Sequence, residues 1–474
     1  MNQLLFERST GNLGPNVFAR LQTTRLLSSL QAAPQLRFDG GERGTAIQQD
    51  EAGSSEAPTL KRGIWAHQAG VNAIAIERLV SGGSDASVKL WDLESCGNPS
   101  TSHVYQPLAS VKRGDRGHKY GITHMSFYPF DAAAFLSTSY DQTLKLWSTE
   151  TLSISGSFTL GSKIYTHSMS PIADHLLVAC GTQHPTVRLV DLRSGANVQS
   201  LAGHTNAVLA TAWSPRHEYI LASGSVDGTV RIWDIRRAGG TIGMLDKEDS
   251  LGLHYNGLLG TDGRPRTRLA AKAHSGPVNG LAWTDDGNFL ISGGHDRRIR
   301  VWDAATGANT LASFGPSIKN WQLGSVTMFT SPTGVTHPRK ELLFWPNETE
   351  ILVFDLHEGR LVTKLRNTGP AVAGVRSANG SERTAQNRIT ALAWRGAGGG
   401  GMSSGVAMGG SNMAGAIFSA HLDGQIRAWI PRLEGPEDED EAEETSETKE
   451  DKLKKRKALD DAFNSLMGKQ VTFS

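Results

Sequence analysis

Short runs of alternating apolar and polar residues recur along most of the chain. In "TVRIW" (229–233), the polar Arg231 separates the apolar Val230 and Ile232. A period of two predicts short β-strands with one buried face, and the Asp-containing segments between the runs predict tight turns. At the N-terminus, by contrast, apolar residues follow a helical spacing. The chain is therefore predicted to be all-β, with a helical segment at its start.

One fourteen-residue pattern recurs five times. In every copy a serine stands four residues before an aspartate, and a tryptophan follows six residues after that aspartate. Four copies also have a histidine upstream, at His67, His118, His204 and His274. The copies are "LVSGGSDASVKLWD" (Leu79–Asp92), "FLSTSYDQTLKLWS" (Phe135–Ser148), "LASGSVDGTVRIWD" (Leu221–Asp234), "LISGGHDRRIRVWD" (Leu290–Asp303) and "IFSAHLDGQIRAWI" (Ile417–Ile430).

The serine, histidine and aspartate of each copy allow two interpretations. A hydrolase has one such triad per active site, whereas this chain repeats the set four or five times. We therefore favour a buried hydrogen-bond chain, from Trp to Ser to His to Asp, that satisfies polar groups which would be costly to bury alone. The predicted tetrads are His67, Ser81, Asp85 and Trp91; His118, Ser137, Asp141 and Trp147; His204, Ser223, Asp227 and Trp233; and His274, Ser292, Asp296 and Trp302.

Two weaker copies raise the count to seven. "LLVACGTQHPTVRLVD" (Leu176–Asp191) has His184 and Val190 in place of the aspartate and tryptophan, and "ELLFWPNETEILVFD" (Glu341–Asp355) keeps only the apolar alternation. The last copy has Ala385 where its upstream histidine would stand. These residues resemble WD repeats, which implies a seven-bladed WD40 β-propeller over residues 59–433. A ring also needs an early strand to complete its last blade, and Thr59–His67 is the candidate.

Composition narrows the class of protein. At 474 residues, the chain is too long for one simple core, and its net charge of +1 offers no general field for nucleic acid. Two cysteines fit a reducing compartment, and no apolar run approaches the roughly 20 residues that cross a bilayer. Metal-binding and nucleophile motifs do not occur. We expect a soluble intracellular protein that is not an enzyme, has no cofactor or metal, and binds neither membranes nor specific nucleic-acid sequences.

Several segments lie outside the repeats. Residues 1–31 predict a helical arm with two apolar faces, which either caps its own propeller or also binds a partner. Residues 32–58 predict a flexible linker, and insertions are expected near 238–272, 366–387 and 396–415. Residues 434–474 predict a disordered tail, first acidic and then basic. Its "KLKKRK" cluster (Lys452–Lys457) is either a nuclear import signal or a solvated basic patch.

A closer resemblance rests on particular segments. "LLFERSTG" before the leucine-rich helix, "HSMSPIADHLLVACGT", "AWSPRHEYILASGSVDGTVRIWDIRRAGG" and "GANTLASFG" are similar to the Cockayne syndrome A family. The resemblance runs from about residue 4 to the acidic tail. It implies a nuclear substrate receptor of a cullin-4-type RING ubiquitin ligase that acts in transcription-coupled nucleotide excision repair.

The resemblance also implies partners and contact residues. One propeller face and the N-terminal helix would hold the adaptor, the large subunit of the damaged-DNA-binding protein. The opposite face would engage the Cockayne syndrome B ATPase and RNA polymerase II. Trp233–Arg236 matches the W-D-x-R signature of adaptor-docking propellers, whereas Val190–Arg193 lacks its tryptophan. The adaptor-binding residues implied are Leu5, Phe18, Leu21, Leu27, Asp234 and Arg236.

Two other functions remain compatible with the sequence. Some chromatin- or histone-binding propellers also carry an N-terminal helix, and other WD-repeat propellers act as RNA-processing scaffolds. Arg236 could also be an ordinary surface arginine beside Arg237.

Overall fold

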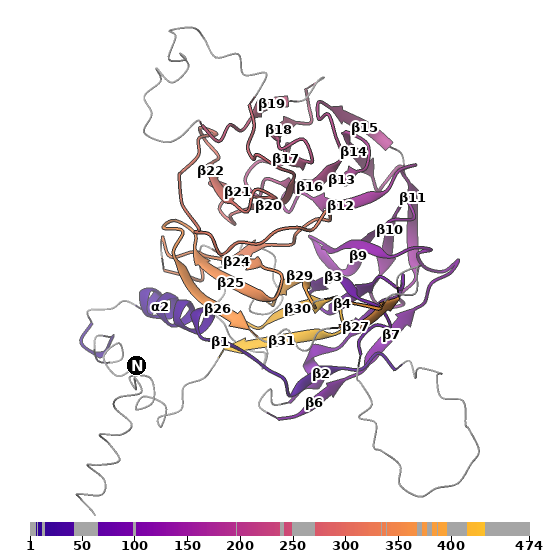
Figure 1. Cartoon of the computed structure of the whole chain (residues 1–474), viewed down its shortest axis with the longest axis horizontal. Coiled ribbons are helices and arrows are strands. Elements are labelled where there is room, and N and C mark those ends of the chain that lie inside the picture. The colour runs from indigo at the N-terminus through magenta and orange to yellow at the C-terminus, as the bar shows by residue number, and fades with distance from the viewer. Residues whose placement is uncertain are drawn as a thin grey trace, which may run out of the picture. The chain divides into compact units, whose positions relative to one another are not determined.

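Seven antiparallel sheets follow one another around a ring in the computed structural model (Figure 1). It describes residues 6, 8–11, 15–41, 65–97, 101–195, 197–237, 241–248, 271–332, 334–337, 339–366, 372–376, 382–385, 387–395 and 415–431. Each sheet is one blade, and the first strand of most blades lines a central channel. The predicted seven-bladed all-β propeller is confirmed.

The first three blades have four strands each. Blade 1 contains β3 (Val71–Ile76), β4 (Leu79–Gly83), β5 (Val88–Trp91) and β7 (Pro107–Val111); blade 2 contains β8 (Ile122–Tyr128), β9 (Asp131–Ser139), β10 (Thr143–Ser148) and β11 (Ile154–Thr159); blade 3 contains β12 (Ile164–Met169), β13 (Leu177–Thr182), β14 (Thr186–Asp191) and β15 (Asn197–Ala202). A one-turn helix, η1 (Leu93–Ser95), and the strand β6 (His103–Tyr105) lie between β5 and β7.

The remaining blades differ in their outermost strand. Blade 4 contains β16 (Val208–Trp213), β17 (Ile220–Ser225), β18 (Val230–Asp234) and β19 (Thr241–Met244); blade 5 contains β20 (Val278–Trp283), β21 (Phe289–Gly294) and β22 (Ile299–Asp303); blade 6 contains β23 (Phe329–Thr330), β24 (Leu342–Pro346), β25 (Glu350–Asp355) and β26 (Leu361–Arg366); blade 7 contains β29 (Ile389–Trp394), β30 (Ile417–His421) and β31 (Ile426–Pro431). Strand β19 lies inside the 238–272 segment, which the sequence predicted to be loop.

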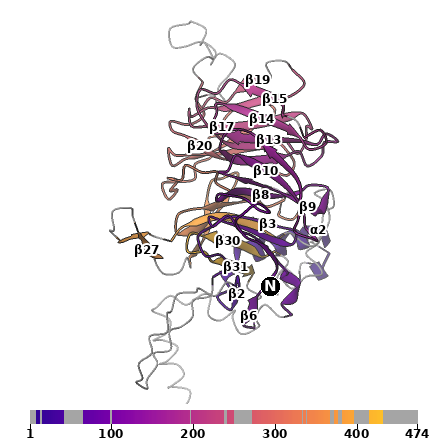
Figure 2. The same cartoon turned by 90° about the vertical axis from the view of Figure 1, so that its right-hand side faces the viewer.

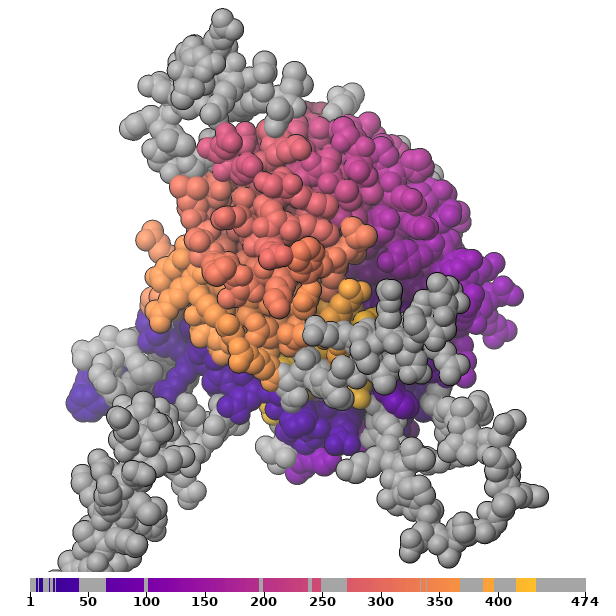
Figure 3. Space-filling model, in the orientation of Figure 1, coloured from indigo at the N-terminus to yellow at the C-terminus, as the bar shows by residue number. Residues whose placement is uncertain are grey.

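The ring closes through β1 (Leu30–Ala32), which pairs with the outer edge of β31. The sequence assigned this role to Thr59–His67, and that prediction was wrong. Among the described residues of that stretch, Ala66 and His67 donate backbone hydrogen bonds to Gly424 O and form no strand. In Figure 3 the indigo N-terminal residues border the orange residues of blade 6.

Part of the predicted 32–58 linker is also built into the core. Strand β2 (Leu36–Phe38) runs parallel to β6 and pairs Phe38 with Tyr105. The Phe38 ring stacks on Tyr105 with centroids 4.7 Å apart, and its edge meets Trp91 at 5.3 Å. Phe38 is buried between blades 1 and 7 because aromatic residues of both blades surround it. Residues 42–58 lie outside the described part of the chain.

Helix α2 (Pro15–Ser28) precedes β1 and packs against the propeller near its C-terminal end. Leu27 has no exposed surface and packs with Leu30 and with residues of blades 6 and 7. Thr23 hydrogen-bonds Val335 O, and the His337 N–H donates to Thr24 Oγ1 at 3.1 Å. Within the described residues, no helix has the length and apolar character that a membrane crossing requires.

The blades present two faces. The first and third strands of a blade run in the same direction, so the loops after them open on one side, here called the lower face, which includes 215–219, 235–237 and 335–337. The loops after the second and fourth strands, such as 140–142 and 295–298, form the upper face. Loop 319–324 lies on the same face, because His295 contacts the backbone oxygen of Gln322. Figure 2 shows the hairpin of β27 (Val372–Arg376) and β28 (Glu382–Ala385) on one side of the ring and α2 toward the other. The segments 396–414 and 434–474 lie outside the described residues.

Candidate functional site

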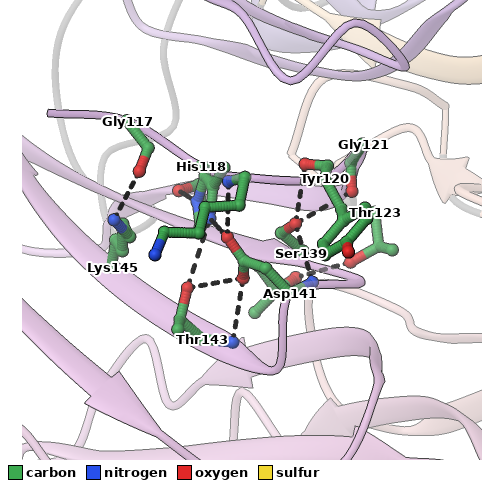
Figure 4. A network of polar contacts seen from close by, with 12 residues as sticks. Gly117, His118, Tyr120, Gly121, Thr123, Ser139, Asp141, Thr143 and Lys145 are labelled. Carbon is green, nitrogen blue, oxygen red and sulfur yellow. Dashed lines mark hydrogen bonds and ion pairs between the residues drawn. The ribbon is translucent and has the colours of Figure 1, made fainter. Parts of the chain in front are cut away.

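The four tetrads that the sequence proposed are present as hydrogen-bond chains. In blade 2, Trp147 Nε1 donates to Ser137 Oγ at 2.7 Å, and Ser137 Oγ lies 2.6 Å from His118 Nε2. His118 Nδ1 lies 2.9 Å from Asp141, whose other carboxylate oxygen accepts from the Thr143 hydroxyl and N–H (Figure 4). Blades 4 and 5 repeat this chain, with His–Asp distances of 3.3 and 2.9 Å.

Blade 1 varies the last step of the chain. His67 Nδ1 contacts Ser87 Oγ at 2.7 Å, and this hydroxyl then donates to Asp85 at 2.6 Å. Asp85 itself is 3.5 Å from the imidazole. Trp91, Ser81 and His67 keep the spacing of the other blades, 2.8 and 2.7 Å.

Burial and hydrogen bonding set the charges of the tetrads. Burial would raise the pKa of Asp141, but hydrogen bonds from His118 and Thr143 outweigh it and bring this pKa well below its ordinary value. Burial lowers the pKa of His204 and His274 even though Asp227 and Asp296 oppose the shift. The resulting state is an ionised carboxylate that accepts a hydrogen bond from the Nδ1–H of a neutral imidazole.

The serines of the tetrads are not placed to act as nucleophiles. Ser137, Ser223 and Ser292 are each fully buried, and each hydroxyl oxygen already accepts a bond from a tryptophan. With the imidazole Nδ1–H directed to the carboxylate, Nε2 accepts from the serine, so the chain is satisfied from end to end. The tetrads therefore hold blades together, and the functional surface must be sought elsewhere.

Blade 7 builds a shortened tetrad that the sequence reasoning missed. Trp429 Nε1 donates to Ser419 Oγ at 2.8 Å, and the histidine on this serine is His421, two residues further along the same strand, at 2.8 Å. Glycine occupies this position in blade 5, where a Cβ on Gly294 would lie 2.4 Å from the tetrad imidazole. A histidine at this position thus places an imidazole on Ser419 from within the strand itself. The "SAH" triplet was the available signal.

A tetrad variant tests this structural role. Asp227→Ala should remove the acceptor from the buried His204 and lower the free energy of unfolding by about 1–3 kcal/mol. Glu150→Ala, at an exposed site, is the matched control and should leave stability unchanged. Urea unfolding measures both variants. Wild-type stability in Asp227→Ala would contradict the structural role.

The W-D-x-R residues form a rigid fork on the lower face. Asp234 is buried, and its two carboxylate oxygens accept from Arg236 Nε at 3.0 Å and Nη2 at 2.9 Å. The guanidinium also lies over the Tyr219 ring, 4.8 Å from the centroid. The Arg236 side chain nevertheless stays 62% exposed. The arginine is thus held in one orientation with donors still available to a partner.

A depression of about 580 Å³ adjoins the fork. Its lining includes Ile172 from blade 3, which is 43% exposed, and Tyr219 and Arg216 from the first loop of blade 4. No sequence pattern pointed to these three residues, because two different blades supply them. The weaker copy in blade 3 does not repeat the fork: in the described structure, Asp191 accepts from Ser194 and from backbone N–H groups, and Arg193 forms no ion pair with it.

The arm residues divide into three groups. Leu27, which the family resemblance assigned to the adaptor, is completely covered by the propeller and anchors α2 instead. Leu21 is half-buried. Val17, one turn earlier, is 40% exposed. Leu5 and the side chain of Phe18 lie outside the described part of the structure.

The central channel contains a cavity of about 280 Å³ that is lined by both polar and apolar side chains. Nδ1 of His124 and Nδ1 of His167 lie 3.3 Å apart, and Ser126 Oγ contacts His167 Nε2 at 2.8 Å. Burial lowers the pKa of His124 to about 4 and that of His167 further below its usual value. Among the described residues, no three His, Cys, Asp or Glu side chains are grouped so that they could hold a metal ion.

Comparison with known proteins identifies the repeats. The family model "WD domain, G-beta repeat" matches residues 59–92, 108–148, 195–234 and 264–303, which are the segments that contain the four complete tetrads. These segments are WD40 repeats, and the chain folds as a seven-bladed propeller. This WD40 fold is a scaffold, and the prediction that the protein is not an enzyme is confirmed by the match to it.

The WD40 propeller has two kinds of relatives. "WD repeat-containing protein ATCSA-1" of Arabidopsis thaliana is 28% identical over 424 residues, which are 77% of this chain and 88% of the relative. "Ribosome biogenesis protein YTM1" of Phaeosphaeria nodorum is 30% identical over 50% of this chain and 55% of its own length. The protein of that name from Podospora anserina is 28% identical over 60% and 63%.

Proposed function

We propose that this WD40 propeller is the substrate-recognition subunit of a cullin-4-type RING ubiquitin ligase in transcription-coupled nucleotide excision repair. It would bridge the large subunit of the damaged-DNA-binding protein to the Cockayne syndrome B ATPase and stalled RNA polymerase II. In this role the protein acts in the nucleus and raises the effective concentration of a substrate near the ligase. The likeness to ATCSA-1, which covers most of both chains, supports this proposal.

The Arg236 fork is the structural observation that carries it. Buried Asp234 fixes the guanidinium over Tyr219, so little side-chain entropy is lost when a partner carboxylate or carbonyl binds it. The adjoining depression adds an exposed Ile172 beside this charge. Helix α2 is anchored to the loop 335–337 on the same lower face. An adaptor on this face would contact the fork and the exposed side of the helix.

Variants of the fork test adaptor binding directly. Arg236→Ala should weaken binding to the purified adaptor about tenfold, which corresponds to about 1.4 kcal/mol. Arg237→Ala is the matched control. Arg237 is 69% exposed, and its Nε lies 3.6 Å from the same carboxylate, but it makes no bidentate contact with it. Calorimetry or interferometry gives the dissociation constants, and circular dichroism checks folding.

The arm should matter more than the fork. Phe18→Asp with Leu21→Asp places two charges on the helix and should abolish adaptor binding, because a buried anchor contributes more than a rim charge. Since Leu27 is untouched, α2 stays anchored and the propeller stays folded. Normal adaptor binding by this double variant and by Arg236→Ala would contradict the receptor proposal.

The relatives named for ribosome biogenesis favour a second candidate, an RNA-processing scaffold. Their likeness covers only about half of this chain, which a shared WD40 propeller can account for. Affinity purification from native cells with mass spectrometry separates the two functions. The adaptor and a cullin support the first candidate, and pre-ribosomal proteins support the second.

A further inference from the structure

A loop on the upper face, residues 319–324, is held by an unusual number of hydrogen bonds. The buried side chains of Asn279 and Asn320 exchange two hydrogen bonds, at 3.0 and 2.7 Å. The backbone oxygen of Gln322 accepts from Asn279 Nδ2 at 2.6 Å and from His295 Nε2 at 2.7 Å. Gln322 Nε2 in turn donates to Ile389 O of blade 7 at 2.9 Å. The loop is therefore tied to blades 5 and 7.

This fixed loop presents two large apolar side chains to solvent. Residues alternate along it: Asn320 and Gln322 point inward, whereas Trp321 is 58% exposed and Leu323 is 68% exposed. Exposed apolar groups on a pre-organised backbone are typical of binding hot spots, because little conformational entropy is lost when a partner covers them. The chain then continues directly into residues 325–328, which line the central cavity.

An arginine in a strained conformation covers one side of Trp321. The Arg297 guanidinium lies 4.5 Å from the centroid of the indole. Arg297 has a φ of 57°, in the left-handed region that favours glycine; the matching turn positions are Gly228 and Gly424 in blades 4 and 7, but Ala86 and Gln142, with φ of 65° and 69°, in blades 1 and 2. The positive φ is thus a feature of this turn in several blades, and what distinguishes Arg297 is its contact with the exposed Trp321.

The charges around the loop are mainly positive. Arg297, Arg298 and Lys319 are exposed. The nearby Asp296 is already engaged by His274 and Arg300, at 2.9 and 2.8 Å. Glu348 is half-buried on the neighbouring turn. The surface thus combines two apolar side chains with a border of basic groups that form no ion pair with the residues the structure describes.

We propose that loop 319–324 together with Arg297 is the docking site for an extended acidic segment of a partner protein. A large apolar side chain of that segment would cover Trp321 and Leu323, and carboxylates on either side of it would bind Arg297, Arg298 and Lys319. The proposal names the kind of segment that the upper face of the propeller would bind. It rests on the proposed function only for the identity of the protein that supplies this segment. A protein segment fits better than a nucleic acid, because the aliphatic Leu323 forms no base-stacking platform.

The test uses the full-length chain and synthetic peptides of twelve residues. One set places a single Trp, Phe or Leu between glutamates; matched sets replace the glutamates with glutamine or lysine. Fluorescence anisotropy should show that only the acidic set binds, and that its affinity falls with added salt. Trp321→Ala with Leu323→Ser should weaken this binding at least tenfold.

Arg297→Gly is the sharpest variant. It removes the guanidinium and also relieves the positive φ, so stability should not fall and any lost affinity cannot arise from unfolding. Affinity for the acidic peptide should fall at least fivefold. Arg236→Ala, on the lower face, is the matched control and should bind the peptide like wild type.

Three results would overturn the proposal. They are no acidic peptide binding up to about 1 mM, equal binding of the lysine set, and unchanged affinity in the Trp321 and Leu323 double variant. An oligothymidylate of twelve nucleotides that binds and is lost in the same variants would instead make this loop a nucleic-acid site. Adaptor binding, measured in parallel on the lower face, shows whether the docking site or the ligase role has failed.

Discussion

Removing residues 1–41 will unfold the propeller. This segment supplies the closing strand β1 and the buried side chains Leu27, Leu30, Leu36 and Phe38. Each such side chain contributes about 1.5–3 kcal/mol by burial, and all four together approach the roughly 5–15 kcal/mol by which a whole domain is stable. The loss also leaves β31 with an open edge that invites aggregation.

A matched truncation isolates this effect. Deleting residues 1–14 keeps α2, β1 and β2, so its melting temperature should equal that of the full chain. Phe38→Ala alone should cost about 3–5 kcal/mol, because it empties a site between blades 1 and 7. Thermal melts by circular dichroism measure all three proteins. A cooperative wild-type transition in the 1–41 deletion would show that another strand closes the ring.

Lowering the pH will destabilise the propeller at pH values well above those at which carboxylates are protonated. Burial lowers the pKa of five histidines, which are His124, His167, His204, His274 and His421. In the unfolded chain an imidazole titrates near about 6.5, so below that pH the unfolded state binds more protons than the folded state. The free energy of unfolding therefore falls as pH falls, by up to about 1.4 kcal/mol per pH unit for each histidine.

One histidine acts in the opposite direction. A hydrogen bond from His357 to the Glu341 carboxylate raises the pKa of His357, so its contribution to stability is fully present below about pH 6.5 and is lost as pH rises through the raised pKa. One such group cannot offset five. Near pH 4 and below, the tetrad aspartates add a further loss, because their folded pKa values are depressed and protonation breaks their bonds to histidine.

Urea unfolding between pH 7.5 and 5.0 measures the slope of stability against pH. His124→Gln should reduce that slope by up to about 1.4 kcal/mol per pH unit, the contribution of one proton, because glutamine does not titrate. His217→Gln, at an exposed position, should leave the slope unchanged. A free energy of unfolding that does not change across this pH range would contradict the lowered pKa values of the buried imidazoles.

The sequence found Arg236 but not the surface around it. The W-D-x-R signature is local, because Asp234 and Arg236 are two residues apart and the turn itself brings their side chains together. Tyr219 and Ile172 belong to loops of two different blades, and only the ring brings them beside Arg236. Trp321 is a comparable case: its partner Arg297 and its supporting Asn279 are distant in sequence.

What the sequence determined by itself is the repeated part of the molecule. The period-two alternation and the Ser–Asp–Trp spacing specify strands, turns and tetrads within single blades, since each tetrad spans few residues and its hydrogen bonds are satisfied locally. Only the tertiary structure decided how the ring closes and which side chains remain exposed. Strand β1 is three residues long, and "LQA" has no pattern of its own. It becomes a strand because β31 offers it an edge and blades 6 and 7 bury Leu30. The same packing covers Leu27, which on a helix alone would have been free to meet a partner.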